Sequence, residues 1–276
     1  MGEGIIDALQ TGVVKIMQRV TVDSRYGKIV VAPNDRFVGR SLIEYGEFSE
    51  GEARLFKKLI TPDMTVTDVG ANFGAHTLLF SQLASQVYAF EPQKCVFEAL
   101  CETMKLNDIK NVMAINAPVG TGARVKYNDL DMAVNNYGSF SFVGVKEGKP
   151  MPTVQLTAPC DFLKVDVEGM ELDVLRGAEA MIKSSRPILY VENDRKEKSD
   201  MLIQYINYLG YECYWDTPML FNEDNFFGKK ENIFPDILSI NMLCVEKGVD
   251  MGDAKKATVG DWERMFRRKD ERHVYS

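Results

Sequence analysis

Two spacings of apolar residues alternate along most of this chain, and together they predict an α/β fold. Stretches with apolar residues on one helical face occur at about Ala75–Ala84, Cys95–Leu106, Leu172–Lys183 and Met201–Leu209. Short apolar runs typical of buried strands flank them, at Thr65–Val69, Gln86–Phe90, Val112–Asn116, Asp161–Val167, Ile188–Glu192, Tyr211–Trp215 and Ile240–Val245. This alternation predicts a doubly wound, mostly parallel, seven-stranded sheet with helices on both faces.

The two ends of the chain predict additions to this sheet. Ile5–Val20 carries its apolar residues on one helical face, Lys28–Val31 favours a short strand, and Gly51–Ile60 favours a helix. After Lys247 the chain is charged, and an aromatic pair spaced by four residues favours a docked amphipathic helix. We therefore expect an N-terminal helix and strand extension over 1–60, a central domain over 61–246 and a helical tail over 247–276. The sequence leaves open whether the extension caps a site or builds a dimer interface.

The most informative segment joins the first predicted strand to the following helix. It reads Asp68-Val69-Gly70-Ala71-Asn72-Phe73-Gly74. Glycine has no Cβ and tolerates positive φ, so backbone can approach a ligand closely here, next to the N–H groups of a helix start. Seventeen residues later, Glu91 ends the next predicted strand, where a carboxylate can accept hydrogen bonds from a ribose diol. The pattern predicts a ligand that contains a nucleoside.

The spacing of the glycines distinguishes between the possible nucleoside ligands. A dinucleotide fingerprint needs G-x-G-x-x-G, but Asn72 stands where the middle glycine should lie, and no phosphate loop of the form G-x-x-x-x-G-K-[ST] occurs. Asp68 would repel a pyrophosphate, whereas it would attract the ammonium and sulfonium of S-adenosylmethionine. We therefore expect S-adenosylmethionine as the cofactor and S-adenosylhomocysteine as its product.

Several motifs in order make the chain resemble a class I S-adenosylmethionine-dependent methyltransferase of the FkbM type. They are the glycine segment above, Phe90-Glu91-Pro92, Asn135-Asn136-Tyr137-Gly138, Phe162-Leu163-Lys164-Val165-Asp166-Val167-Glu168-Gly169-Met170-Glu171 and Leu175-Arg176-Gly177. The resemblance runs from about Gly39 to about Glu246. It implies methyl transfer, most often to an oxygen of a sugar or natural product.

The residues expected to bind the cofactor follow the first three predicted strands. Asp68 and the backbone of 70–72 would receive its methionine end, Thr77 would reach its carboxylate, and Glu91 would hold the ribose. Asn116 could read the adenine edge, although asparagine is also an ordinary turn residue. The full set is Asp68, Gly70, Ala71, Asn72, Gly74, Thr77, Glu91, Pro92 and Asn116.

The residues expected to act on the acceptor come mainly from the later strands. Lys164, Asp166 and Glu168 alternate, which places them on one face of a strand, and Glu192 ends the next strand. Two close carboxylates raise the pKa of one of them, which would give a base for a hydroxyl acceptor. Which carboxylate is the base stays open. Acceptor-binding candidates are His76, Asn135 and Asn136.

Composition narrows the possible partners. A net charge of −7 and a pI near 5.1 disfavour a nucleic-acid footprint, so we expect a small-molecule or glycan acceptor. Five Cys without a C-x-x-C pair and only two His predict reduced thiols and no metal centre. We expect no membrane span, no signal peptide and a cytoplasmic location, and the sequence leaves a homo-oligomer open. The competing classes are a nicotinamide dehydrogenase, a methyltransferase for RNA, protein or amines, and a non-catalytic cofactor-binding protein.

Overall fold

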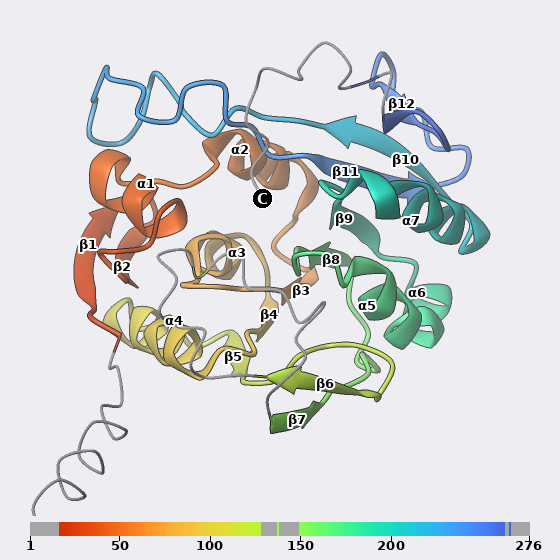
Figure 1. Ribbon diagram of the computed structural model, residues 1–276, viewed down its shortest axis with the longest axis horizontal. Coiled ribbons are helices and arrows are strands. Elements are labelled where there is room, and N and C mark those ends of the chain that lie inside the picture. The colour runs from red at the N-terminus through yellow and green to blue at the C-terminus, as the bar shows by residue number, and fades with distance from the viewer. Residues whose placement is uncertain (1–16, 128–136, 138–148, 263–264, 266–276) are drawn as a thin grey trace, which may run out of the picture.

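The computed structural model describes residues 17–127, 137, 149–262 and 265. Its centre is an eight-stranded sheet in the order β12-β10-β11-β9-β8-β3-β4-β5, which runs from β5 at the lower left to β12 at the upper right of Figure 1. The strands are β3 (Thr65–Val69), β4 (Gln86–Phe90), β5 (Val112–Ile115), β8 (Phe162–Val165), β9 (Ile188–Glu192), β10 (Tyr211–Asp216), β11 (Asn241–Glu246) and β12 (Lys256–Ala257).

Strand direction in the sheet changes only toward its β12 edge. Strands β5, β4, β3, β8 and β9 are parallel, whereas β11 is antiparallel to both β9 and β10, and β12 is antiparallel to β10. The chain leaves β3 toward β4 and β5 on one side, and returns to β8 and β9 on the other. Ligands of open α/β sheets bind where the strand order reverses in this way, outside the carboxyl ends of the strands. All seven predicted strands lie in this sheet, so the predicted fold class is confirmed; only the short β12 was not predicted.

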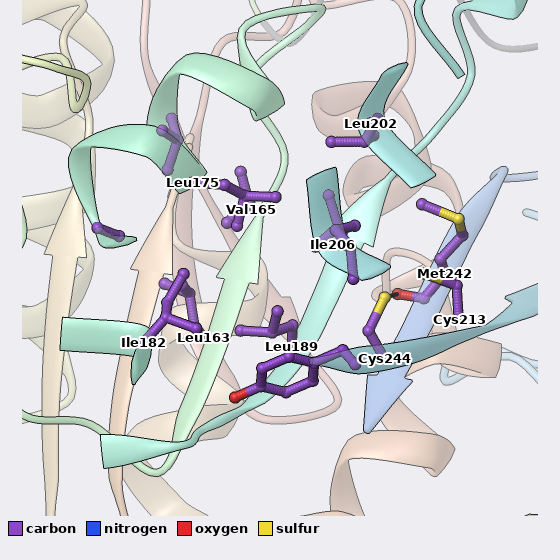
Figure 2. Close-up of a cluster of buried hydrophobic side chains, with 14 of the residues drawn as sticks. Leu163, Val165, Leu175, Ile182, Leu189, Leu202, Ile206, Cys213, Met242 and Cys244 are labelled. Carbon is purple, nitrogen blue, oxygen red and sulfur yellow. Dashed lines mark hydrogen bonds between the residues drawn. The ribbon is translucent and has the colours of Figure 1, made fainter. Parts of the chain in front are cut away.

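One face of the sheet is covered by α5 (Glu171–Gly177), α6 (Glu179–Ser185) and α7 (Lys196–Tyr208). Figure 2 shows helix side chains meeting strand side chains in this layer. Leu175, Ile182 and Ile206 are completely or almost completely buried there, as are Leu163 and Leu189 beneath them. Each such leucine or isoleucine stabilises the fold by about 1.5–3 kcal/mol relative to an exposed side chain.

The other face is covered by α2 (Glu50–Leu59), α3 (Ala75–Leu83) and α4 (Lys94–Leu106). Phe56 of α2 is fully buried, and its ring centroid lies 5.1 Å from Phe80 of α3, 5.6 Å from Phe162 of β8 and 4.8 Å from Tyr190 of β9. The contacts with Phe162 and Tyr190 are edge-on, which is a favourable aromatic geometry. They fix α2, which precedes the first parallel strand, directly against the centre of the sheet.

The N-terminal extension differs from its prediction. The structure has a hairpin of β1 (Val20–Ser24) and β2 (Gly27–Val31), followed by α1 (Val38–Tyr45). A helix reaching Val20 is therefore wrong at its end, because 17–19 are not helical and Val20 pairs with Val31; residues 5–16 of that prediction lie outside the described residues. Neither β1 nor α1 was predicted. The hairpin is attached to α4, where the N–H of Val30 donates to Thr103 Oγ1 at 2.9 Å.

Three further segments differ from the predicted elements. The single helix expected over Leu172–Lys183 is two helices, α5 and α6, which meet at Ala178. Between β5 and β8, β6 (Arg124–Tyr127) and β7 (Lys149–Pro152) form a small antiparallel sheet where only irregular structure was expected. Strand β8 ends at Val165 and not at Val167. Among the described residues, no helix has both the length and the apolar content needed to cross a bilayer. Most of the predicted tail helix lies outside the described residues.

Candidate active site

A pocket opens beyond the carboxyl ends of β3, β4, β8 and β9, on the side predicted by the strand order. Residues from many parts of the chain line it, including the glycine turn after β3 and the segments that follow β4, β8 and β9. It brings together most of the residues singled out in the sequence: Gly70, Ala71, Asn72, His76, Glu91, Pro92, Lys164, Asp166, Glu168 and Glu192. Asn135 and Asn136 lie outside the described residues, although their neighbour Tyr137 lines the pocket.

The glycine turn is shaped by a close contact with the segment after β8. Gly70 has φ +84°, and a Cβ added to it would lie 1.8 Å from the carbonyl oxygen of Asp166. No other residue type fits without moving that backbone. The N–H groups of Gly70 and Ala71 both donate to the carbonyl of Phe90, each at 3.0 Å. A ligand at this turn therefore does not meet these two donors, which differs from the expectation that they are open to it.

Glu91 locks the end of β4 to the glycine turn. One of its carboxylate oxygens accepts the N–H of Asn72 at 3.0 Å, and the other accepts the N–H of Gln93 at 2.8 Å. Burial raises the pKa of Glu91 to about 7, although these two backbone bonds oppose the shift. An ionised carboxylate has about four acceptor positions, so two remain for a ligand hydroxyl pair.

Several predicted cofactor residues lie behind the pocket wall. Asp68, Gly74, Thr77 and Asn116 are not among the described residues that line it. Asp68 is fully buried, and Thr77 Oγ1 donates to its Oδ2 at 2.6 Å. Asn116 donates through Nδ2 to the carbonyls of Glu91 and Pro92. The structure thus gives Asp68, Thr77 and Asn116 contacts that support the pocket from outside. Asp68 and Thr77 are fully buried and do not reach a ligand directly in this geometry, whereas contact between the exposed Asn116 and the adenine edge stays a prediction.

Lys164 is the buried cation of the site. Its side chain is 3% exposed, and its Nζ lies 3.1 Å from Asp166 Oδ2 and 3.6 Å from Asp68 Oδ1. Burial disfavours its charge, but the two aspartates outweigh burial and raise the pKa of Lys164 above its ordinary value. The ammonium is therefore present throughout the physiological range.

Three carboxylates meet beyond the ends of β8 and β9. Oxygen atoms of Asp166, Glu168 and Glu192 lie within 4.8 Å of one another. The N–H of Glu168 donates to Glu192 at 3.3 Å, and Arg195 Nη2 lies 2.5 Å from Glu168 Oε2. Burial, followed by the charge of Asp166, raises the pKa of Glu168 and of Glu192 well above the ordinary value. The predicted neighbouring carboxylates with raised pKa values are thus present.

Their arrangement arises differently from the predicted strand alternation. Because β8 ends at Val165, Asp166 and Glu168 lie in a turn, where Glu168 has φ +55° and Gly169 has φ +96°. The left-handed backbone at Glu168 is uncommon for a residue with a side chain.

The three carboxylates of Asp166, Glu168 and Glu192 also have the oxygen donors that a divalent cation prefers. The sequence predicts these three residues as carboxylates of the acceptor site and does not predict a cation there; in the structure, Lys164 and Arg195 supply positive charge beside them.

Five polar lining residues were not predicted from the sequence: Glu52, Gln93, Asp194, Ser239 and Asn241. Asp194 follows Glu192 at a strand end, so the rule that found Glu192 could have found it too. Glu52 belongs to Ser49-x-x-Glu52, a string typical of a helix capping box. Ser239 and Asn241 precede and begin β11, and nothing local distinguishes them from other strand-end residues.

The fold and the pocket together define the class of protein. Strands β5, β4, β3, β8 and β9 run parallel, and the antiparallel strand β11 lies between β9 and β10. A glycine turn follows the central strand β3, and the acidic residue Glu91 follows the neighbouring strand β4. These are the features of a class I S-adenosylmethionine-dependent methyltransferase. The model of the family described as "Methyltransferase FkbM domain" matches residues 68–213, more than half of the 276 residues. The chain therefore belongs to the FkbM methyltransferase family, and its cofactor is S-adenosylmethionine.

Individual relatives are more distant. The chain is 26% identical over 137 residues to the hexuronic acid methyltransferase AglP of Haloferax volcanii, which covers 48% of this chain and 56% of that protein. The chain thus spans little more than half the length of that relative. A precorrin-6y C5,15-methyltransferase from Geobacter metallireducens covers 74% of this chain and 94% of its own, with a TM-score of 0.47 and 13% identity. A methyltransferase FkbM from Methylobacillus flagellatus covers 70% and 50%, with a TM-score of 0.43 and 14% identity. Neither structural similarity says anything about the acceptor.

Proposed function

We propose that this methyltransferase methylates a hydroxyl group, on a sugar, a glycoconjugate or a small natural-product alcohol. The observation that carries the proposal is the group of three carboxylates at the ends of β8 and β9, two of which have raised pKa values. A hydroxyl is a weak nucleophile at neutral pH and reacts faster when a positioned base takes its proton. The distant relative that acts on a hexuronic acid supports an acceptor of this kind.

The residues around the glycine turn and β4 fit the cofactor. Glu91 has acceptor positions left for the ribose diol, and Pro92 lines the pocket next to it. The N–H groups of Gly70 and Ala71 already donate to the carbonyl of Phe90, so they are not available to a ligand. A turn without free N–H donors suits an ammonium better than a phosphate. When bound, S-adenosylmethionine supplies a methyl carbon activated by a sulfonium.

The residues after β8 and β9 would orient the acceptor and receive its proton. Glu168 and Glu192 are both largely buried, and burial raises the pKa of each carboxyl well above its ordinary value, which makes either carboxylate a stronger base. Asp166 lies between them and Lys164, whose ammonium limits the build-up of negative charge. The acceptor hydroxyl would lie against these carboxylates and in line with the methyl carbon. Such orientation of the two reactants accounts for much of the rate of methyl transfer.

Transfer of a labelled methyl group tests the proposal. The full chain is incubated with S-adenosylmethionine labelled at the methyl group and with methyl β-glucuronide, methyl β-glucoside or glycerol, and products are identified by mass spectrometry. We expect an O-methyl product and a loss of about 10²–10⁴-fold in rate for whichever of Glu168→Gln and Glu192→Gln removes the base. The control Glu98→Gln, an exposed residue paired with Arg19, should react like the wild type. Methylation of amines or RNA with no O-methyl product would refute the proposal.

A further inference from the structure

One wall of the pocket comes from outside the matched FkbM domain. Glu52 of α2, and Ser239 and Asn241 beside β11, lie before and after residues 68–213, yet they line the same pocket as Glu91 and Asp166. Glu52 is 4% exposed. Buried carboxylates are rare unless they are paired, so the position of Glu52 calls for an explanation.

Glu52 is held by groups that fix its orientation. Its Oε1 accepts hydrogen bonds from Ser49 Oγ at 2.7 Å and from Asn241 Nδ2 at 3.2 Å. Asn241 also donates to Tyr190 OH at 2.9 Å, which ties this network to β9. The second oxygen, Oε2, lies 3.8 Å from His76 Nε2. Ser239 also forms a side-chain hydrogen bond with the Glu52 carboxylate. The carboxylate is therefore anchored by three side chains, and its Oε2 lies next to His76.

His76 has a buried nitrogen without a hydrogen-bond partner. The residue is 7% exposed, lines the pocket, and its Nε2 makes no hydrogen bond with any described residue. The rings of Phe48, Phe56 and Phe80 enclose the imidazole at centroid distances of 5.9, 5.2 and 6.1 Å. Burial and the charge of Lys164 lower the pKa of His76 well below its ordinary value, so the imidazole is neutral. A distance of 3.8 Å to Glu52 is too long for a hydrogen bond.

The chemistry of this gap favours a hydroxyl group. A hydroxyl can donate to the carboxylate of Glu52 and accept from the imidazole N–H of His76, so it satisfies both. An anion would be repelled by Glu52. An ammonium would be disfavoured by Lys164, whose charge acts on both Glu52 and His76. A neutral group that is donor and acceptor at once remains.

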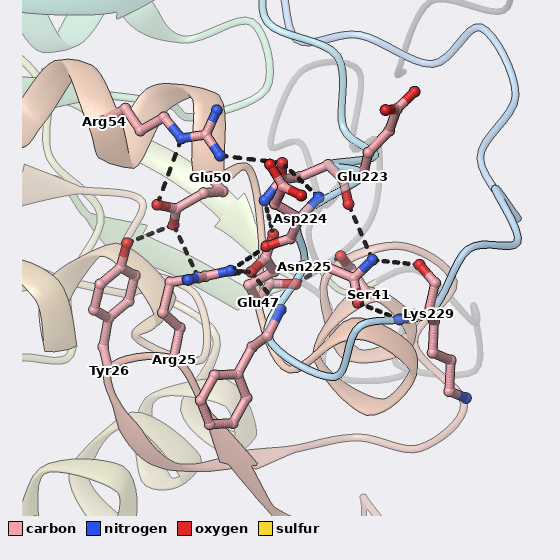
Figure 3. Close-up of polar contacts among 12 residues, drawn as sticks. Arg25, Tyr26, Ser41, Glu47, Glu50, Arg54, Glu223, Asp224, Asn225 and Lys229 are labelled. Atoms are coloured by element: carbon pink, nitrogen blue, oxygen red, sulfur yellow. Dashed lines mark hydrogen bonds and ion pairs between the residues drawn. The ribbon is translucent and has the colours of Figure 1, made fainter.

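The surrounding structure holds α2 in place for this role. Figure 3 shows Glu50, two residues before Glu52, bonded to Tyr26 OH and flanked by Arg25 at 3.7 Å and Arg54 at 3.9 Å. Glu47 joins the same cluster, since it accepts from Arg25 at 2.7 Å and from the segment after β10, including the N–H of Phe226 at 2.9 Å. A binding group that is already fixed loses less conformational entropy when its ligand arrives.

We propose that Glu52 and His76 bind one hydroxyl group of a polyhydroxylated acceptor between them, at a subsite that α2 completes. This inference rests on the proposed function, since it assigns an acceptor contact to the same pocket. The acceptor is then held at two places: the hydroxyl that reacts lies against the carboxylates after β8 and β9, and a second hydroxyl lies against α2. A single alcohol would occupy only one of them, so the subsite selects polyols.

The histidine signals of the full chain test this directly. The chain contains two histidines, His76 and His273, so a protein labelled at histidine Cε1 gives two signals, and His76→Gln assigns them. The protein is loaded with S-adenosylhomocysteine and titrated with methyl β-glucoside, methyl β-glucuronide or glycerol. We expect a saturable shift of the His76 signal with at least one probe, while the His273 signal stays in place. Ethylammonium and inorganic phosphate should leave the His76 signal unchanged.

Variants separate this inference from the proposed function. Glu52→Gln keeps the size of the side chain and an oxygen for Asn241, so we expect it to fold, to bind S-adenosylhomocysteine within twofold of the wild type, and to bind the probe about tenfold or more weakly. The control Glu98→Gln should match the wild type. If S-adenosylhomocysteine binds but no polyol moves the His76 signal, or Glu52→Gln binds the probe as well as the wild type, the inference is overturned while the methyltransferase assignment stands. A shifted His76 signal without any O-methyl product would instead refute the proposed reaction alone.

Discussion

Replacing Lys164 by methionine removes the buried ammonium that lies beside Asp68 and Asp166. The side chain is 3% exposed, and Asp166 and Asp68 lie 3.1 and 3.6 Å from its Nζ. Methionine has a similar length and an apolar stem, so Lys164→Met removes the ammonium with little change in packing. The loss of stability then measures how much the buried aspartates depend on Lys164.

The expected loss follows from the burial of each partner. Removing one partner of a fully buried ion pair costs about 3–5 kcal/mol, because it leaves an uncompensated charge. Here Asp166 is 37% exposed in its side chain, and Asp68 keeps the hydrogen bond from Thr77. Both features reduce the cost, so we expect the free energy of unfolding to fall by about 2–4 kcal/mol at pH 8.

The loss should depend on pH in a defined direction. Burial raises the pKa of Asp68 and, to about 7, that of Glu52, while Lys164 lowers both. Without Lys164 both folded-state pKa values rise further. A carboxyl whose folded pKa lies above its unfolded value stabilises the fold fully below the unfolded value, near pH 4, and loses this contribution as the pH rises through the folded pKa. The penalty of Lys164→Met is therefore smaller at pH 5.5 than at pH 8.

Urea unfolding of the wild type and Lys164→Met at these two pH values measures the effect. Lys183→Met is the matched control, since Lys183 forms an exposed ion pair with Glu179 and should change the midpoint little. A penalty below about 1 kcal/mol at pH 8, or an equal penalty at both pH values, would show that Lys164 does not balance the buried carboxylates.

Three further variants test the close contact at Gly70 and the role of Glu168. Gly70→Ala should destabilise the protein by more than about 2 kcal/mol and weaken S-adenosylhomocysteine binding, because its Cβ would meet the backbone of Asp166. Gly122→Ala has a similar φ, +89°, with open space around it, so calorimetry should show only about 1 kcal/mol of backbone strain there and unchanged binding; equal effects of the two variants would contradict the close-contact argument. Arg195→Gln removes the cation that lowers the pKa of Glu168, so that pKa rises further. If Glu168 takes the proton, the methyl-transfer rate rises with pH through that pKa, and the midpoint moves to higher pH in the variant; an unmoved midpoint excludes Glu168 as the base.

The sheet could be predicted because its signals are local. Apolar runs such as Val87–Phe90 are short, bounded by polar residues, and separated by helical stretches of the length that a parallel crossover needs. The same logic located Glu91 and Glu192, because a residue at the end of a parallel strand reaches the ligand edge whatever the rest of the chain does. Strand β1 was missed because Val20–Ser24 is short and contains only two apolar residues, Val20 and Val22, and its pairing with β2 cannot be read from those residues alone.

The remainder of the pocket depends on contacts between distant segments. Glu52 meets Asn241 across 189 positions, and no pattern around either residue reports that contact. Asp68 occupies the expected strand end, yet it faces the buried side toward Thr77 and Lys164, which the position alone does not reveal. The predicted alternation of Asp166 and Glu168 likewise assumed that the strand continued to Val167. In the structure, Glu168 lies instead in a turn with left-handed backbone.

The assignment of the cofactor site depends most on Glu91, which would hold the ribose of S-adenosylmethionine at the end of β4. Isothermal titration of S-adenosylhomocysteine into the wild type, Glu91→Ala and the control Glu98→Ala tests it most directly, with thermal unfolding to confirm that each variant is folded. We expect saturable binding by the wild type and the control. The affinity of Glu91→Ala should be lower by about 100-fold or more, because two hydrogen bonds from the ribose to the carboxylate disappear. Absence of binding by the wild type, or undiminished binding by folded Glu91→Ala, would contradict this assignment.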